Sequence, residues 1–463
     1  MRREPAPDVP GIDAIGLIDE IERPRMQAYV ARMHARFPIL ERARHPLLRG
    51  GAWTFVGQLG AQSIALAANA VVGRVLGSIG FGLYSLAQNM GSTAATVAGY
   101  APALVGTRAA AAARSSRAEA RDATRRTLRT AFFVGILAAG ILVALSPRYT
   151  RLIAQSREAL VVFGVASVLT LPLIWLATCG ALLAGLGAFR LFAIGRIIAA
   201  PFSAALTVVG ALAFGVPGAL LGLLLGTGVI AAVAHARVRR AIELVPNNGA
   251  ATARRRTADD RLLLPAALSS AASAPVIWIC QTLLATRGGV SSVAVIGASI
   301  VWGQALLLVP TSLNQALLAE LAHAATSPSG SARRVFLLGW NTAVMSTVAL
   351  LPLIVLAAPI ILRAYGFQDT STTLAFRLVV SAYAIQGVTG AAIKVLESYG
   401  RIWLQLALNL VWAAVFIGLV LLWRTNGAVG FGRAAVAAFL VHGTLIHLFA
   451  FHFVAARTHN SHG

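Results

Sequence analysis

The sequence predicts an all-α membrane protein in which about twelve transmembrane helices form two six-helix bundles with a central cavity. Three observations predict this fold. Of the 463 residues, 57% are hydrophobic and only 12% are charged, whereas a soluble domain carries about 25% charged residues. The mean hydropathy is +0.75. Apolar runs close to the ~20 residues that cross a ~30 Å hydrocarbon core recur from Gly51 to the end of the chain.

The stretch before the first apolar run differs from the rest of the chain. Residues 1–50 are polar and carry charges of both signs, so we expect a cytoplasmic N-terminal leader. A cleavable signal peptide begins with a short basic stretch followed by an apolar segment, and neither arrangement occurs here. We therefore place no span in this region.

The apolar runs fall into two sets of six, separated by a basic stretch. We expect a first bundle over 51–236, a basic cytoplasmic linker over 237–261, a second bundle over 262–455 and a cytoplasmic tail over 456–463. The predicted spans are 51–73, 83–105, 130–147, 160–186, 190–213, 216–236, 262–285, 291–321, 334–357, 374–396, 400–423 and 430–455.

Two weak correspondences between residues of the two halves suggest that the halves are structural repeats, as in many transporters. Arg74 follows the first span and Arg287 follows the seventh, 213 residues later. Pro102 in the second span corresponds to Pro310 in the eighth, 208 residues later. Three glycines in the sixth span, Gly218, Gly222 and Gly226, form a row of small residues that predicts close helix packing.

The arginine distribution predicts the orientation. With the N-terminus inside, 25 arginines near the span ends lie on the inner face and nine on the outer face. Positive residues collect on the cytoplasmic side, so both termini are expected in the cytoplasm. The net charge of +23 is accounted for by these short tracts between spans, and we predict no nucleic-acid partner.

The motifs argue against an enzyme. A P-loop needs a Gly-Lys pair to hold terminal phosphates, and the only lysine, Lys394, follows Ile393. A membrane glycosyltransferase needs a carboxylate or similar base at the membrane surface, and the clear acids of the short outer loops are Glu158 and Asp369. We predict no catalytic residue. Lys394 and Glu397, three residues apart, are expected to pair across one helical turn.

No metal site or cofactor is predicted. His442, His447 and His452 recur every five residues in the last span, and a step of five turns a side chain by roughly 140° around a helix. A helical metal pair needs two ligands on one face. Cys179 and Cys280 lie inside apolar runs, which excludes a disulfide scaffold.

Polar residues inside the spans are costly and therefore informative. They concentrate in spans one, two, seven and eight, which hold corresponding positions in the two halves. As a set they predict one shared aqueous cavity, although any single one of them is also explained by hydrogen bonding between helices. The candidate cargo-binding residues among them are Gln58, Gln62, Gln88, Asn89, Gln281, Gln304 and Asn314.

Carboxylates are nearly absent from the same zone. Within the predicted spans only Glu320 is acidic, at the inner end of span eight. A carrier of cationic drugs needs a buried acid to pair with its cargo. Amides, hydroxyls and flanking arginines suit an anionic, sugar-bearing cargo better.

Residues 74–88 read RVLGSIGFGLYSLAQ. They resemble the R-x-LG-x-x-x-FG-x-Y signature of polysaccharide biosynthesis proteins, the lipid-linked oligosaccharide flippases of the multidrug/oligosaccharidyl-lipid/polysaccharide exporter superfamily. Residues 99–111, GYAPALVGTRAAA, resemble the end of that family's second span, where Arg108 takes the usual basic position. Where the family often has Pro-Glu in the first outer loop, this chain has Ser78 and Ile79.

The resemblance implies a flippase that works by alternating access in a bacterial inner membrane, serving surface or exopolysaccharide synthesis. Its partners would be a lipid-linked oligosaccharide, membrane lipid and the polymerase and glycosyltransferases of the same pathway. Arg108 is the first candidate for phosphate contact, followed by Arg74 and Arg287 near the outer mouth. Two alternatives remain open: a cation-coupled multidrug exporter of the same superfamily, and a non-transporting membrane component of a glycan assembly complex.

Overall fold

The computed structural model describes residues 46–114, 116–153, 157–246, 260–314, 317, 321 and 332–460. The described membrane helices belong to one compact unit, Gly51–Gly463, apart from the start of the first helix. Most of the predicted leader, the middle of the predicted linker (247–259), the acid Glu320 and the end of the tail lie outside the described residues.

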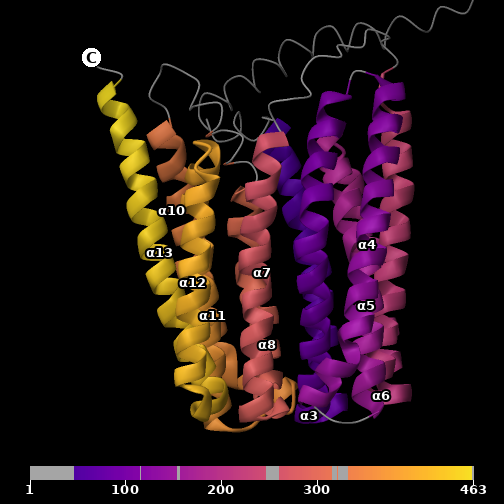
Figure 1. The fold of residues 1–463 in the computed structure, drawn as a ribbon, viewed down its shortest axis with the longest axis vertical. Helices are drawn as coiled ribbons and strands as arrows, with labels where there is room; N and C mark the ends of the chain where they lie inside the picture. The colour runs from indigo at the N-terminus through magenta and orange to yellow at the C-terminus, as the bar shows by residue number, and fades with distance from the viewer. Residues whose placement is uncertain are drawn as a thin grey trace, which may run out of the picture. The chain divides into compact units, whose positions relative to one another are not determined.

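Long helices make up the described part of both halves (Figure 1). The first half consists of α3 (Pro46–Ala112), α4 (Arg117–Ile153), α5 (Arg157–Gly185) and α6 (Phe189–Glu243). The second half consists of α7 (Asp260–Gly288), α8 (Val290–Leu306), α10 (Ala332–Ala364), α11 (Thr370–Ser398), α12 (Ile402–Leu422), a short 3-10 turn (Arg424–Asn426) and α13 (Gly427–Asn460).

The described helices account for twelve membrane crossings, as predicted. Nine helices in this part of the chain are long and apolar enough to cross, and α8 with the following segment to Asn314, bent by 51°, makes a tenth. Two of these ten contain two spans each. α3 reverses at Gly77 (φ 68°) and α6 reverses at Phe214 and Gly215 (φ 61°), where the backbone leaves the helical region.

We call the end of the helices where α3 begins and α13 finishes the terminal end, and the opposite end the distal end. Gly77 and Gly215 lie at the distal end, as does the turn between α10 and α11. The turns between α5 and α6 and between α11 and α12 lie at the terminal end.

Glycines with positive φ show that the halves are repeats. Gly289 follows Gly77 by 212 residues, Gly400 follows Gly187 by 213, and Gly427 follows Gly215 by 212. Each pair occupies the corresponding turn of the two halves, and an L-residue with a side chain would be strained at such angles. The 213-residue spacing of Arg74 and Arg287 therefore reflects a real repeat.

The halves share a hydrophobic core at the distal end and have separate cores at the terminal end. The shared core contains Phe81 and Tyr84 of α3 together with Ile296 of α8 and Tyr365, and the rings of Phe81 and Tyr365 are 5.4 Å apart. Toward the terminal end, one cluster draws only on residues between Ala110 and Val245, and another only on residues between Leu317 and Val454. Burial thus joins the halves at one end only.

The predicted glycine row packs as expected, and its partner is the preceding span of the same helix. An added Cβ would lie 2.1 Å from the Gly210 carbonyl oxygen at Gly218 and 2.1 Å from the Leu206 carbonyl oxygen at Gly222. At Gly226 it would lie 2.5 Å from Ser203 Cα. The two spans of α6 therefore meet backbone to backbone.

We expect Gly222→Ala to lower the free energy of unfolding by about 1–3 kcal/mol, because the new methyl group meets a rigid backbone. Gly228→Ala on the same helix is the matched control, since nothing lies within 4 Å of its added Cβ. It should be neutral, or stabilising by up to about 1 kcal/mol through helix propensity. Thermal unfolding of both purified variants measures the difference; equal melting temperatures would contradict the packing described.

Candidate functional site

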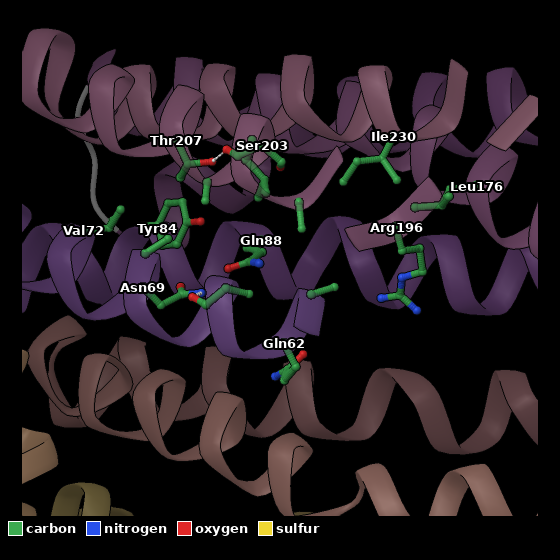
Figure 2. Close-up of a pocket in the computed structure, with 16 residues that line it drawn as sticks. Gln62, Asn69, Val72, Tyr84, Gln88, Leu176, Arg196, Ser203, Thr207 and Ile230 are labelled. Carbon is green, nitrogen blue, oxygen red and sulfur yellow. Dashed lines mark hydrogen bonds between the residues drawn. The ribbon is translucent and has the colours of Figure 1, made fainter. Parts of the chain in front are cut away.

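A cavity of about 180 Å³ lies inside the first half, enclosed by α3, α5 and α6 (Figure 2). All of its lining residues come from this half, whereas the sequence predicts a cavity lined by residues of both halves. They are Ala61, Gln62, Ala65, Ala68, Asn69, Val72, Tyr84, Gln88, Leu176, Arg196, Ala200, Ser203, Ala204, Thr207, Leu223 and Ile230.

Three amides of α3 reach this cavity from two spans. Gln62 and Asn69 are seven residues apart, which places them on one face of the first span, and Gln88 comes from the second span. Asn69 Nδ2 donates to the Ala65 carbonyl at 2.9 Å, whereas its buried Oδ1 has no hydrogen-bond partner among the described residues. This oxygen is available to a donor in the cavity.

Arg196 is the cation of the lining. It lies seven residues after Phe189, the first residue of α6, or about 10 Å along the helix. Its guanidinium lies 5.7 Å from the ring centre of Phe192, and it forms no ion pair within the described part of the chain. Because none of the lining residues is a carboxylate, the cavity carries a positive field, strengthened by its low-dielectric surroundings.

The predicted amides face one another across the two halves. Asn89 Nδ2 donates to Gln281 Oε1 at 3.0 Å, and Gln62 Nε2 donates to the Val301 carbonyl at 3.3 Å. Ser312 Oγ donates to Gln58 Oε1 at 3.4 Å. These bonds run between α3 and the α7–α8 region, so the polar groups in question join the halves and do not face lipid.

Two other predicted amides in the second half lie outside the cavity lining. Gln304 is exposed on α8. Asn314 packs against α11, since a Cβ at Gly390 would lie 2.5 Å from its Nδ2. Their assignment to cargo binding stays a prediction.

The three predicted arginines also lie outside the lining. Arg108 is half-buried toward the terminal end of α3, and Arg74 is exposed at the distal end, three residues before Gly77. Arg287 belongs to the last turn of α7, but its side chain is outside the described residues. The structure therefore brings Gln62 and Gln88 of the predicted set to the cavity and leaves the arginines at the helix ends.

Sequence reasoning missed Arg196, Ser203 and Thr207. The positive-inside count places Arg196 among the inner-face arginines that orient the chain, although it lies two helical turns inside an apolar run. Ser203 and Thr207 are four residues apart on one helical face. An isolated arginine followed by hydroxyl residues on one face is the signal that could have identified them.

The second half carries a different group at the position equivalent to Arg196. Asn409 follows Arg196 by 213 residues, the spacing of the repeat, and is buried on α12. Its Nδ2 donates to Ser269 Oγ at 2.9 Å. Its Oδ1 therefore accepts from Nε2 of the buried His442, at 3.1 Å. A neutral, hydrogen-bonded network thus takes the place of the cation.

Other titratable groups of the described chain serve structure. Lys394 Nζ and Glu397 Oε2 pair at 2.6 Å, as predicted, and Gln405 Nε2 donates to the other carboxylate oxygen at 3.4 Å. No group of three or more His, Cys, Asp or Glu side chains within the described ranges could hold a metal ion. The cavity at Arg196 is suited to recognition by charge and hydrogen bonds.

Comparison with known proteins agrees with this architecture. Residues 47–259 match the family described as polysaccharide biosynthesis protein. No match was found among curated proteins.

Solved structures share the fold at low sequence identity. A MATE protein in complex with MaD3S is 16% identical with a TM-score of 0.64, and a MOP superfamily transporter from Pyrococcus furiosus is 16% identical with a TM-score of 0.61. An outward-facing multidrug resistance MATE transporter of the same superfamily is 17% identical with a TM-score of 0.60. In each case the match covers 89% of this chain and 96% of the other.

With twelve crossings in two repeated halves, the chain has the fold of these solved membrane transporters. The similarity to the polysaccharide biosynthesis protein family covers residues 47–259, somewhat less than half of the chain.

The bond between Asn89 and Gln281 should contribute a measurable coupling between the halves. Asn89→Ala and Gln281→Ala each remove one partner, so the double variant should lose less stability than the sum of the single variants. Hydrogen bonds between membrane helices average about 0.6 kcal/mol and reach about 1.7 kcal/mol. Thermal unfolding of the four proteins measures this coupling, with Ser63→Ala, which bonds only to its own helix, as control. Strict additivity would show that the pair does not interact.

Proposed function

We propose that this protein is a flippase that moves a polyprenyl-diphosphate-linked oligosaccharide across the inner membrane for surface or exopolysaccharide synthesis. The observation that carries the proposal is the cavity at Arg196, which combines a guanidinium with amides and hydroxyls and has no carboxylate in its lining. The similarity of residues 47–259 to the polysaccharide biosynthesis protein family supports the same cargo class.

The chemistry of such a cargo explains why these groups are needed. A sugar diphosphate cannot cross hydrocarbon unaided, because burying an unpartnered polar group costs several kcal/mol and a charge costs more. The planar fork of an arginine binds phosphate oxygens in pairs. The amides of Gln62 and Gln88 can both donate to and accept from sugar hydroxyls. The apolar polyprenyl tail would stay in lipid throughout.

The shared distal core is consistent with one end state of an alternating-access cycle. With both termini in the cytoplasm, as the arginine distribution predicts, halves joined at the distal end and separate at the terminal end correspond to an inward-facing state. To open outward, the protein must separate the shared distal core and rearrange the bonds that join Asn89, Gln62 and Gln58 to the second half. At about 0.6 kcal/mol each, these bonds order the contact between the halves without locking it.

The alternative is a cation-coupled multidrug exporter of the same superfamily. The fold does not separate the two, since the structural neighbours include multidrug MATE transporters. The charge of the cavity favours the flippase, because a cationic drug needs an acid and the cavity offers Arg196 instead. The neighbour from Pyrococcus furiosus is itself described by a binding pocket of reverse polarity that suggests a different function, so pocket charge varies on this fold.

Arg196→Ala should slow flipping of a fluorescent lipid-linked oligosaccharide in proteoliposomes by about 10- to 100-fold. A hydrogen bond to a charged group contributes about 1.5–3 kcal/mol, and each 1.36 kcal/mol is a factor of ten. Arg196→Lys keeps the charge but loses the paired geometry, so we expect an intermediate rate. Arg121→Ala, an exposed arginine of α4, is the control and should flip at the wild-type rate. Wild-type flipping by Arg196→Ala would remove this cavity from the cargo path.

A deletion strain separates the candidate functions in the cell. Loss of surface polysaccharide with unchanged drug sensitivity supports the flippase, and the reverse outcome supports the exporter.

Complementation with Arg108→Ala and Arg108→Lys then tests the proposed phosphate contact of Arg108 near the terminal end. We expect reduced polysaccharide with Ala and partial recovery with Lys; full output with Ala would exclude Arg108 from the site. Failure of the pure protein to flip any lipid-linked sugar would favour a non-transporting component of the assembly complex.

A further inference from the structure

A second hollow, separate from the Arg196 cavity, lies in the second half between α10, α11 and α13. Its volume is about 630 Å³, within the range of about 300–1,000 Å³ that is typical of small-molecule sites. We call it the α10–α13 groove. In Figure 1, α10 and α13 lie on the side of the second half away from α3–α6, so the groove is not part of the contact between halves. Its lining residues are Trp340, Thr347, Ala384, Ile385, Val388, Thr389, Leu440, Gly443, Thr444, His447, Leu448 and Phe451.

The groove is open to the surface of the helix bundle and its wall is mostly apolar. Leu440, Leu448 and Phe451 remain 51%, 63% and 42% exposed, on a helix whose surroundings are hydrocarbon. His447, a polar residue of the lining, is hydrogen-bonded within the protein, because Trp340 Nε1 donates to its Nε2 at 2.9 Å. Nδ1 therefore carries the proton and donates to the Gly443 carbonyl at 2.6 Å. With both nitrogens engaged, the ring is neutral and held in place.

The length of the groove matches one leaflet. Along α13 it extends from Leu440 to Phe451, eleven residues or about 16 Å. This is about half of the ~30 Å hydrocarbon core, and the half in question is the one nearer the terminal end. One acyl chain of a bilayer lipid has this length and this chemistry.

Basic residues lie where the headgroup of that lipid would be. Arg333 and Arg334 are exposed in the first turn of α10, at the terminal end. Arg333 is seven residues before Trp340, so both lie on one face of α10, about 10 Å apart along its axis. A basic cluster at the mouth of a groove between membrane helices favours an anionic headgroup, and the first turn of a helix adds free backbone N–H groups.

We propose that the α10–α13 groove binds one anionic phospholipid of the terminal-side leaflet, with an acyl chain against Trp340 and Leu448 and the phosphate at Arg333 and Arg334. Neither the cargo nor the Arg196 cavity takes part in this site. The bound lipid would fill a hollow that no side chain of the described residues fills, and would stabilise the packing of α10 against α13.

Native mass spectrometry of the full-length protein tests the site. The detergent-purified protein is given equal amounts of phosphatidylglycerol and phosphatidylcholine with identical acyl chains. At about 1 kcal/mol for each arginine near the surface, we expect wild-type protein to retain phosphatidylglycerol over phosphatidylcholine by roughly 5- to 30-fold. The double variant Arg333→Gln/Arg334→Gln should lose this preference. Arg424→Gln, an exposed arginine at the distal end, should keep it.

Filling the groove tests the chain-binding part independently of charge. Each of the substitutions Thr444→Trp and Leu440→Trp introduces a large ring into the groove from an exposed position of its lining. Both variants should therefore retain less lipid than wild type, whichever headgroup the lipid carries. Leu356→Trp, on α10 but outside the lining and 74% exposed, should behave as wild type. The proposal is overturned if the double arginine variant keeps its lipid preference, if a folded groove-filling variant retains lipid as wild type does, or if lipid-linked oligosaccharide displaces phosphatidylglycerol. Flipping assays report separately on the Arg196 cavity.

Discussion

A bilayer interior has no water to bind a polar group, so each polar side chain there must find a partner in the protein or line a hydrated space. This constraint accounts for where the polar residues of the chain lie. Asn89 is bonded across the halves to Gln281, and Asn409 is bonded to Ser269 and His442. Gln88 and Arg196 instead face a cavity. Asn69 Oδ1, which lines the same cavity and has no hydrogen-bond partner among the described residues, marks a place where another molecule can supply one.

The same constraint gives the two halves different roles. Their backbones follow one plan, but the first half places Arg196 where the second places Asn409. The first half thereby keeps a cation beside a polar-lined cavity within a membrane span. The second half closes the equivalent region with a neutral network and carries a hollow on its outer surface, between α10, α11 and α13. One repeat is thus suited to a charged headgroup and the other to hydrocarbon.

Much of the fold could be predicted from the sequence because it depends on local properties. Hydropathy over ~20 residues determines where a span exists, and spacing along one helix determined both the glycine row at Gly222 and the Lys394–Glu397 pair. The location of the cavity could not be predicted, because it depends on which helix faces turn toward one another. Asn89 and Gln88 are adjacent in sequence, yet one bonds to the second half and the other faces the cavity. Arg196 is assigned to a span end by the rule that places arginines there, although its side chain lines the cavity.

The paired glycine turns affect how the sequence of such a chain can diverge during evolution. Gly77, Gly187 and Gly215, with their counterparts Gly289, Gly400 and Gly427, set the path of the backbone through positive φ angles alone. None of these turn positions needs a side chain, so the turns themselves do not fix which residues line the cavities between the helices. Gene duplication would therefore leave two copies of a frame whose interior residues are free to diverge, and new cargo preferences could arise in one copy while the other preserves the architecture.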